Sequence, residues 1–100
     1  MNNPIDLSAY TNRTVDFMIN GKLVKVQEMT HRMYKEVIAY ENGEEASLDT
    51  QRALVIKMLN NNSSGLKFCD KDIEDLPQGA VLRIYTELIK LPRKALNDPN

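Results

Sequence analysis

Apolar and polar residues alternate on both sides of Asn20-Gly21. This dipeptide is the preferred loop of a two-residue type I′ turn, because both turn positions take a positive φ. With it as the loop, facing residues pair apolar with apolar and acid with base: Val15 with Val26, Phe17 with Val24, Asp16 with Lys25, and Arg13 with Glu28. We therefore predict a β-hairpin with one apolar face. Helices must cover that face, because a lone hairpin is marginally stable in water.

Two stretches with helical spacing of apolar residues follow the hairpin. The first begins after Thr30, a preferred N-cap residue, and runs to about residue 41, before Gly43. The second is capped by Ser47 or Asp49 and runs to about Asn60. The apolar side of the second helix is predicted to hold Leu48, Leu54, Val55, Met58 and Leu59.

The rest of the chain predicts a polar loop at 60–65, a single helical turn capped by Asp70, and a last helix over about 78–91 that starts after Pro77. Apolar residues cover roughly half the circumference of this last helix. Half a circumference is more than one small core usually absorbs, so we expect part of this face to bind a partner. The candidate partner-binding residues are Leu82, Tyr85, Ile89, Met33 and Met58. The alternative for both methionines, and for the wide face itself, is that they fill the core.

These elements predict an α+β fold in which an N-terminal β-hairpin packs on a small bundle of about three α-helices. Residues 1–12 lack periodicity and predict a flexible arm, 13–91 form a single domain, and 92–100 form a flexible tail. One hundred residues fit one domain with a thin core.

Acidic and basic residues nearly balance over the whole chain, but their distribution differs between regions. The net charge is -1, and the acids concentrate in residues 41–75. A domain that binds nucleic acid normally carries a basic excess, so this balance favours a protein partner. The sequence begins without a secretory signal pattern, has no long apolar run, and holds one cysteine, Cys69. We therefore expect a cytoplasmic protein, and neither a membrane nor a nucleic acid as partner.

Residues with catalytic or metal-binding chemistry are few. His31 is the single histidine, and at the first turn of a helix we expect it to be solvated. Cys69 follows Phe68 and is expected to be a small buried hydrophobe. Residues 70–75 imitate the start of a calcium loop, but position six lacks glycine and position twelve, Val81, lacks glutamate. We therefore predict no catalytic residue, no cofactor, no metal site and no enzymatic activity.

One series of features, in fixed order along the chain, is more specific than the composition or the charge. It comprises a short polar arm, an Asn-Gly hairpin carrying the segment 17–22, a Thr-capped helix and an acidic turn. The step Asp72-Ile73-Glu74-Asp75-Leu76-Pro77 into a closing amphipathic helix then follows. Over residues 14–91 this series resembles the small tail assembly chaperones of long-tailed bacteriophages.

The resemblance implies a non-enzymatic chaperone that binds the tape measure protein, keeps it soluble and helps the tail tube protein polymerise around it. It assigns no functional residue of the family to a position of this chain, and the protein could also form a homo-oligomer. An alternative is a small intracellular regulator or adaptor that binds a host or phage protein through the same apolar helix face. The two hypotheses differ in whether the protein promotes tail assembly or forms one defined complex.

Overall fold

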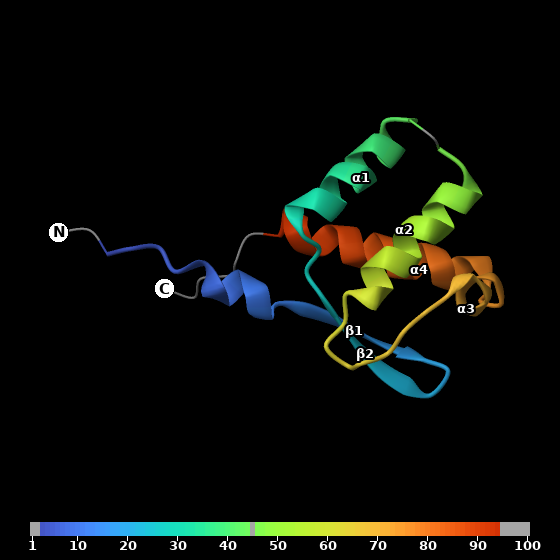
Figure 1. The fold of residues 1–100 in the computed structure, drawn as a ribbon, viewed down its shortest axis with the longest axis horizontal. Helices are drawn as coiled ribbons and strands as arrows, with labels where there is room; N and C mark the ends of the chain where they lie inside the picture. The colour runs from blue at the N-terminus through green and yellow to red at the C-terminus, as the bar shows by residue number, and fades with distance from the viewer. Residues whose placement is uncertain (1–2, 45, 95–100) are drawn as a thin grey trace.

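The computed structural model describes residues 3–44 and 46–94 and has an α+β fold (Figure 1). A two-stranded antiparallel hairpin precedes the helices, as predicted. In chain order the elements are η1 (Leu7–Asn12), β1 (Thr14–Ile19), β2 (Lys22–Gln27), α1 (His31–Glu41), α2 (Leu48–Asn60), α3 (Asp70–Glu74), α4 (Gln78–Lys90) and η2 (Leu91–Arg93).

The hairpin has the predicted register, with Phe17 opposite Val24 and Val15 opposite Val26. The loop residue Asn20 has φ 51° and Gly21 has φ 80°, as a type I′ turn requires. Just outside the ladder, the predicted pair of Arg13 and Glu28 forms an ion pair of 2.7 Å. The turn and the cross-strand pairs thus agree on one register, so the apolar face is fixed toward the helices.

The outer edge of β2 is covered by the loop that follows α2. The Gln27 amide donates to the Asn61 carbonyl at 2.9 Å, and the Ser63 amide donates to the Lys25 carbonyl at 3.0 Å. The Lys25 amide donates in turn to the Ser64 hydroxyl at 2.9 Å. This polar loop therefore serves as a partial third strand that protects one edge of the sheet.

The helix caps lie at the residues predicted from the sequence or next to them. The Thr30 hydroxyl accepts a hydrogen bond from the Met33 amide and caps α1, and the Ser47 hydroxyl caps α2. Between the two predicted caps of α2, the structure thus selects Ser47. At α3 the N-cap position is Cys69, one residue before the predicted cap, and its amide donates to the Asp72 carboxylate at 2.8 Å. This hydrogen bond holds the pKa of Asp72 below its usual value.

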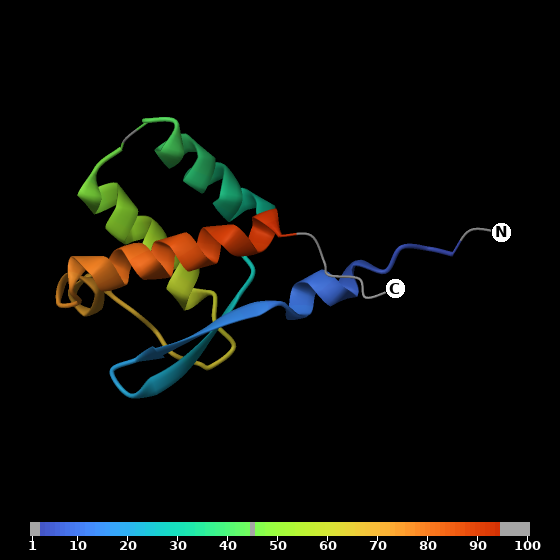
Figure 2. The same ribbon diagram turned by 180° about the vertical axis from the view of Figure 1, so that it is seen from behind.

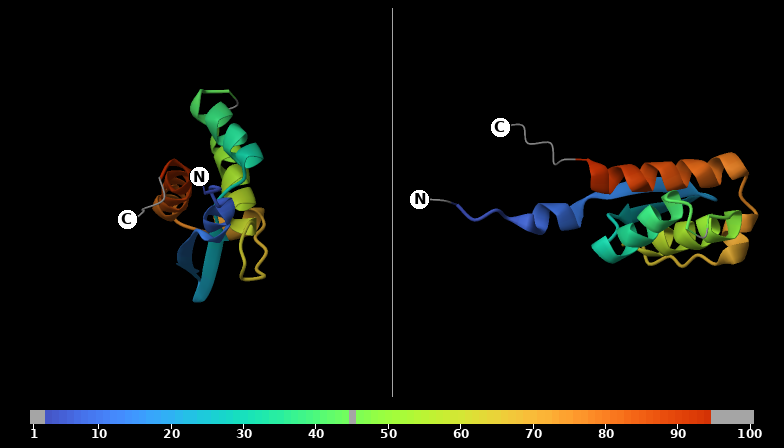
Figure 3. Two further views of the ribbon diagram at one scale, coloured as in Figure 1. Left: turned by 90° about the vertical axis from the view of Figure 1, so that its left-hand side faces the viewer. Right: turned by 90° about the horizontal axis from the view of Figure 1, so that it is seen from above.

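The hydrophobic core lies between the inner face of the hairpin and the helices. Figures 2 and 3 show α4 on one side of the molecule, α1 and α2 on the other, and the hairpin beneath them. The buried hydrophobic cluster contains Val24, Val26, Met29, Val37, Leu54, Val55, Met58, Leu59, Ile73, Val81, Ile84, Tyr85 and Leu88. Each of α1, α2, α3 and α4 contributes to it, so these helices and the hairpin share one core.

The C-terminal end of the described chain lies beside the start of β1, where Arg13 donates to the Leu91 carbonyl at 3.0 Å and to the Lys94 carbonyl at 2.7 Å. Residues 3–12 of the predicted arm stand away from the helices, and Leu7–Asn12 form the short 3-10 helix η1 (Figure 1). At the other end, Arg93 donates to the Tyr34 hydroxyl at 2.8 Å and to the Glu41 carboxylate at 2.7 Å. Contacts with the helices therefore continue past the predicted domain boundary at residue 91. Residues 95–100 of the predicted tail lie outside the described residues.

Candidate protein-binding groove

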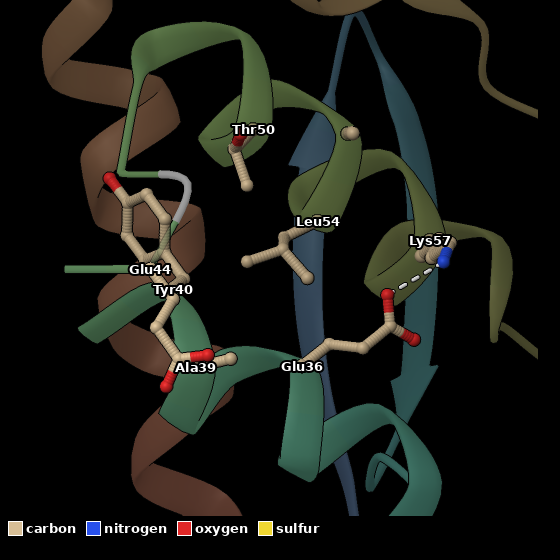
Figure 4. Close-up of a pocket in the computed structure, with 8 residues that line it drawn as sticks. Glu36, Ala39, Tyr40, Glu44, Thr50, Leu54 and Lys57 are labelled. Atoms are coloured by element: carbon tan, nitrogen blue, oxygen red, sulfur yellow. Dashed lines mark hydrogen bonds and ion pairs between the residues drawn. The ribbon is translucent and has the colours of Figure 1, made fainter. Parts of the chain in front are cut away.

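A groove of about 150 Å³ lies between α1 and α2 (Figure 4). We call it the α1–α2 groove. The lining residues are Glu36, Ala39, Tyr40, Glu44, Thr50, Ala53, Leu54 and Lys57. They come from the second half of α1, the connection after it, and the first three turns of α2. The groove forms because Ala39 of α1 and Ala53 of α2 are too small to fill the space between the two helices.

The floor of the groove is apolar, and contacts with neighbouring side chains hold its residues in place. Leu54 is 3% exposed and belongs to the core. The Tyr40 ring packs edge to face on Tyr85, with ring centroids 5.8 Å apart, and its hydroxyl accepts a hydrogen bond from Gln51 at 3.2 Å. Tyr40 is thus fixed at both ends of its side chain, and the groove is preformed.

The rim of the groove carries charge. Lys57 Nζ and Glu36 Oε1 are 2.7 Å apart and close one end, as the dashed line in Figure 4 shows. Glu44 lies at the other end, where the connection between the helices begins. Of the charged residues that line the groove, Glu36 and Glu44 are acidic and Lys57 is basic. The rim is therefore acidic on balance, with its one lysine already paired to Glu36.

This arrangement suits the capture of one apolar side chain. A cavity of about this size holds a benzene-sized group, and a preformed apolar pocket is typical of sites where a helix inserts an anchor residue. Its charged groups, Glu36, Glu44 and Lys57, are at the rim and partly or fully exposed.

A second depression of about 440 Å³ lies between α2, α3 and α4. At its base Gln51 is 6% exposed, and its amide already bonds to Tyr40 and to Gln78. At its rim Arg52 forms ion pairs with three carboxylates, among them Asp49 at 3.0 Å. Since these polar groups satisfy one another, this depression offers less to a ligand than the α1–α2 groove.

The partner-binding residues predicted from the sequence lie mostly inside the protein. Met58 is 1% exposed and Tyr85 is 8% exposed, so their prediction as partner-binding surface residues is wrong and the alternative, that they fill the core, is confirmed for both. Both belong to the core because α4 packs against α2 on one side and the hairpin on another. Met33 and Ile89 are half-buried against the same core, and Leu82 is exposed. The wide apolar face of α4 is therefore largely core, with Leu82 outside it.

Cys69, Leu48 and His31, three further residues singled out in the sequence, are all exposed. Cys69 is exposed, not buried, because it occupies the N-cap position of α3, where the chain turns outward. Leu48, predicted on the apolar side of α2, is exposed at the first turn of that helix. His31 is exposed at the start of α1, as expected. Within residues 3–44 and 46–94, no three potential metal ligands cluster together.

The groove itself was not identified from the sequence. Ala39 and Ala53 each interrupt a helix rich in larger residues, which is a weak signal, because alanine is common in helices for its propensity alone. Only the packing of α1 on α2 brings the two alanines to one place.

Comparison with models of known protein families, with curated proteins and with solved structures found no match to this chain. Among the described helices, none has both the length and the apolar character needed to cross a lipid bilayer.

Proposed function

We propose that this chain is a tail assembly chaperone of a long-tailed bacteriophage, which binds the tape measure protein through the α1–α2 groove and assists assembly of the tail tube protein around it. The role is one of binding and release, without catalysis. The observation that supports it is the groove: an open, preformed site with an apolar floor of Leu54 and Tyr40 and a charged rim. The client and the process come from the family resemblance over residues 14–91.

The chemistry of the groove favours a helical client. One apolar side chain of an amphipathic helix would enter between Ala39 and Ala53, whose small size lets the client backbone come close. The acidic rim, with Glu44 at one end, favours a client that carries Lys or Arg next to this anchor residue. A long helical protein offers many such sites, so individually weak contacts can keep it soluble along its length.

Co-expression tests this function. The chain should raise the soluble fraction of the tape measure protein from the same phage genome and co-elute with it in gel filtration. Ala53→Trp fills the groove from an exposed position and should abolish both effects. Ala46→Trp, at an exposed alanine outside the groove, is the matched control and should keep them. Circular dichroism of both variants checks that the fold persists.

Two results would contradict the proposal. If the tape measure protein gains no solubility and forms no complex, the chain is not its chaperone. A stable complex with a host protein, still blocked by Ala53→Trp, would instead support the adaptor alternative. In that case the groove would be a binding site for a different client.

A further inference from the structure

The N-terminal arm displays apolar side chains that its own domain leaves exposed. Ile5 is 85% exposed, Leu7 is 65% exposed and Tyr10 is 38% exposed. In a 3-10 helix, residues three apart lie on one face, so Leu7 and Tyr10 share one face of η1, and Ile5 precedes that helix; we call these three residues the stripe. The arm is nonetheless locally ordered, because the Asp6 carboxylate caps η1 by accepting from the Ser8 amide at 2.9 Å.

The base of the arm is fixed, which sets its direction. Arg13 pairs with Glu28 at 2.7 Å and donates to the Leu91 carbonyl at 3.0 Å. The same guanidinium lies over the Tyr10 ring, 5.0 Å from its centroid. Held in this way, the arm points away from the domain, while β1 leaves the same point in the opposite direction (Figures 1 and 3). To cover its own hairpin, the arm would have to reverse at Arg13 and break these contacts.

The outer face of the hairpin also presents an apolar pair. Met18 lies directly opposite Leu23, and they are 68% and 49% exposed. The loop after α2 covers the edge of β2, but within the described residues no backbone hydrogen bond covers the outer edge of β1. A strand edge with free backbone hydrogen-bonding groups beside exposed apolar side chains is the kind of surface on which a sheet accepts another chain.

We propose that the arm docks on a second copy of this chain, with the stripe of Ile5, Leu7 and Tyr10 covering the Met18–Leu23 pair and the adjacent edge of β1. From Arg13, the arm runs in one direction and β1 runs in the opposite direction along the same line. A twofold axis perpendicular to this line lays the arm of each copy along β1 of the other copy, so the two equivalent contacts form together. The charges are also complementary. Asp6 is the one charged residue among 3–12, and in this dimer it lies near the hairpin tip of the other copy, which carries the bases Lys22 and Lys25 and one acid, Asp16.

The interface has a modest size. Each copy contributes at most about fourteen residues, namely 3–12 of the arm, the outward-facing Thr14, Asp16 and Met18 of β1, and Leu23, which is below the roughly 20–30 per side of a standard stable interface. The association should therefore depend on concentration, with monomer and dimer in exchange. Analytical ultracentrifugation of the full chain over a wide concentration range should show a mass that rises from one chain to two.

Variants on both sides of the contact test its composition. Ile5→Ser with Leu7→Ser, and separately Met18→Thr with Leu23→Thr, should each raise the dimer dissociation constant about tenfold or more, because each removes two large apolar contacts. These residues are exposed, so the monomer should keep its fold. Leu48→Gln, an equally exposed leucine away from the contact, should leave the constant unchanged.

Disulfide trapping distinguishes this arrangement from other dimers. In a Cys69→Ser background, Leu7→Cys chains mixed with Met18→Cys chains should form mixed disulfides faster than either chain alone. A protein that stays monomeric at every concentration would overturn the proposal. A dimer insensitive to the arm variants, or one without preferential mixed disulfides, would overturn it as well. None of these outcomes depends on the chaperone function.

Discussion

Arg13 joins the hairpin to the segment that follows α4. Its guanidinium pairs with Glu28 at the end of the hairpin, and both side chains are less than one-fifth exposed. It also donates to the Leu91 carbonyl after α4 and to the Lys94 carbonyl at 2.7 Å. A partly buried guanidinium shared in this way supports both the hairpin and the last helix.

Replacement of Arg13 by Ala should lower the free energy of unfolding by about 1.5–3 kcal/mol, because Glu28 and two carbonyls lose a charged donor. Arg13→Lys should recover part of this loss. The control is Arg83→Ala, whose ion pair with Glu87 is solvent-exposed and should contribute less than about 0.5 kcal/mol. Urea denaturation measures all three, and equal losses at Arg13 and Arg83 would contradict the account.

Tyr85 is a second residue with an unusual environment, and that environment raises the pKa of its hydroxyl. Its hydroxyl is buried and has no hydrogen-bond partner among the described residues. Burial is the largest cause that raises the pKa of Tyr85 to about 12, and the negative charge of Glu41 adds to it. The neutral phenol is therefore the form that the folded protein favours.

The pH dependence has a definite sign. Because the pKa of Tyr85 is higher in the folded protein than its value near 10 in the unfolded chain, the stabilisation is complete below pH 10 and is lost as pH rises toward 12. Tyr85→Phe should flatten this loss in alkaline urea denaturation. At neutral pH it should leave the free energy of unfolding unchanged or raise it by up to about 1 kcal/mol, since an unpaired buried hydroxyl is removed. A large loss at neutral pH would show that the hydroxyl has a partner.

At the scale of elements, Asn62 organises the loop that covers the edge of β2. Its side-chain oxygen accepts from the amides of Ser64 and Leu66, and its side-chain nitrogen donates to the carbonyls of Leu59 and Leu66. Asn62→Ala should therefore lower the free energy of unfolding by roughly 2–4 kcal/mol. It should also speed hydrogen exchange at the Gln27 amide, which bonds to this loop.

Asn12→Ala, at an exposed asparagine in η1, is the matched control and should change neither quantity by a measurable amount. Unchanged exchange at Gln27 in the Asn62 variant would mean that the loop covers β2 without help from this side chain.

Elements encoded by local signals could be predicted from the sequence. The Asn20-Gly21 turn fixed the register of the hairpin, and Thr30 marked the start of α1, because turns and caps depend on neighbours in the chain. The α+β class followed from these elements and is confirmed by the structure.

Features that depend on how helices pack could not be predicted in this way. Helical spacing shows that Tyr85 and Met58 lie on apolar faces, but not whether a neighbour covers those faces. The α1–α2 groove depends on the meeting of Ala39 with Ala53, which are fourteen residues apart. Cys69 illustrates the opposite error, because an apolar neighbour in sequence, Phe68, does not bury a residue at a helix cap.

At the scale of the whole molecule, two surfaces lie apart from each other. The α1–α2 groove lies between the helices, while the arm and the outer face of the hairpin lie at the other end of the domain (Figure 1). We propose the first for a helical client and the second for another copy of the chain. Since the two do not share residues, a dimer could hold two segments of one long client, which would strengthen weak individual contacts.

The most direct test of the client site is a methyl NMR titration of the full chain with a helical peptide from the tape measure protein. The peptide should carry an apolar residue flanked by lysine or arginine. We predict that the methyl signals of Ala39, Ala53 and Leu54 shift on addition of the peptide, while that of Leu82 stays unchanged. Shifts confined to Leu82 or to the hairpin, or no shifts at saturating peptide, would contradict the assignment of the α1–α2 groove as the client site.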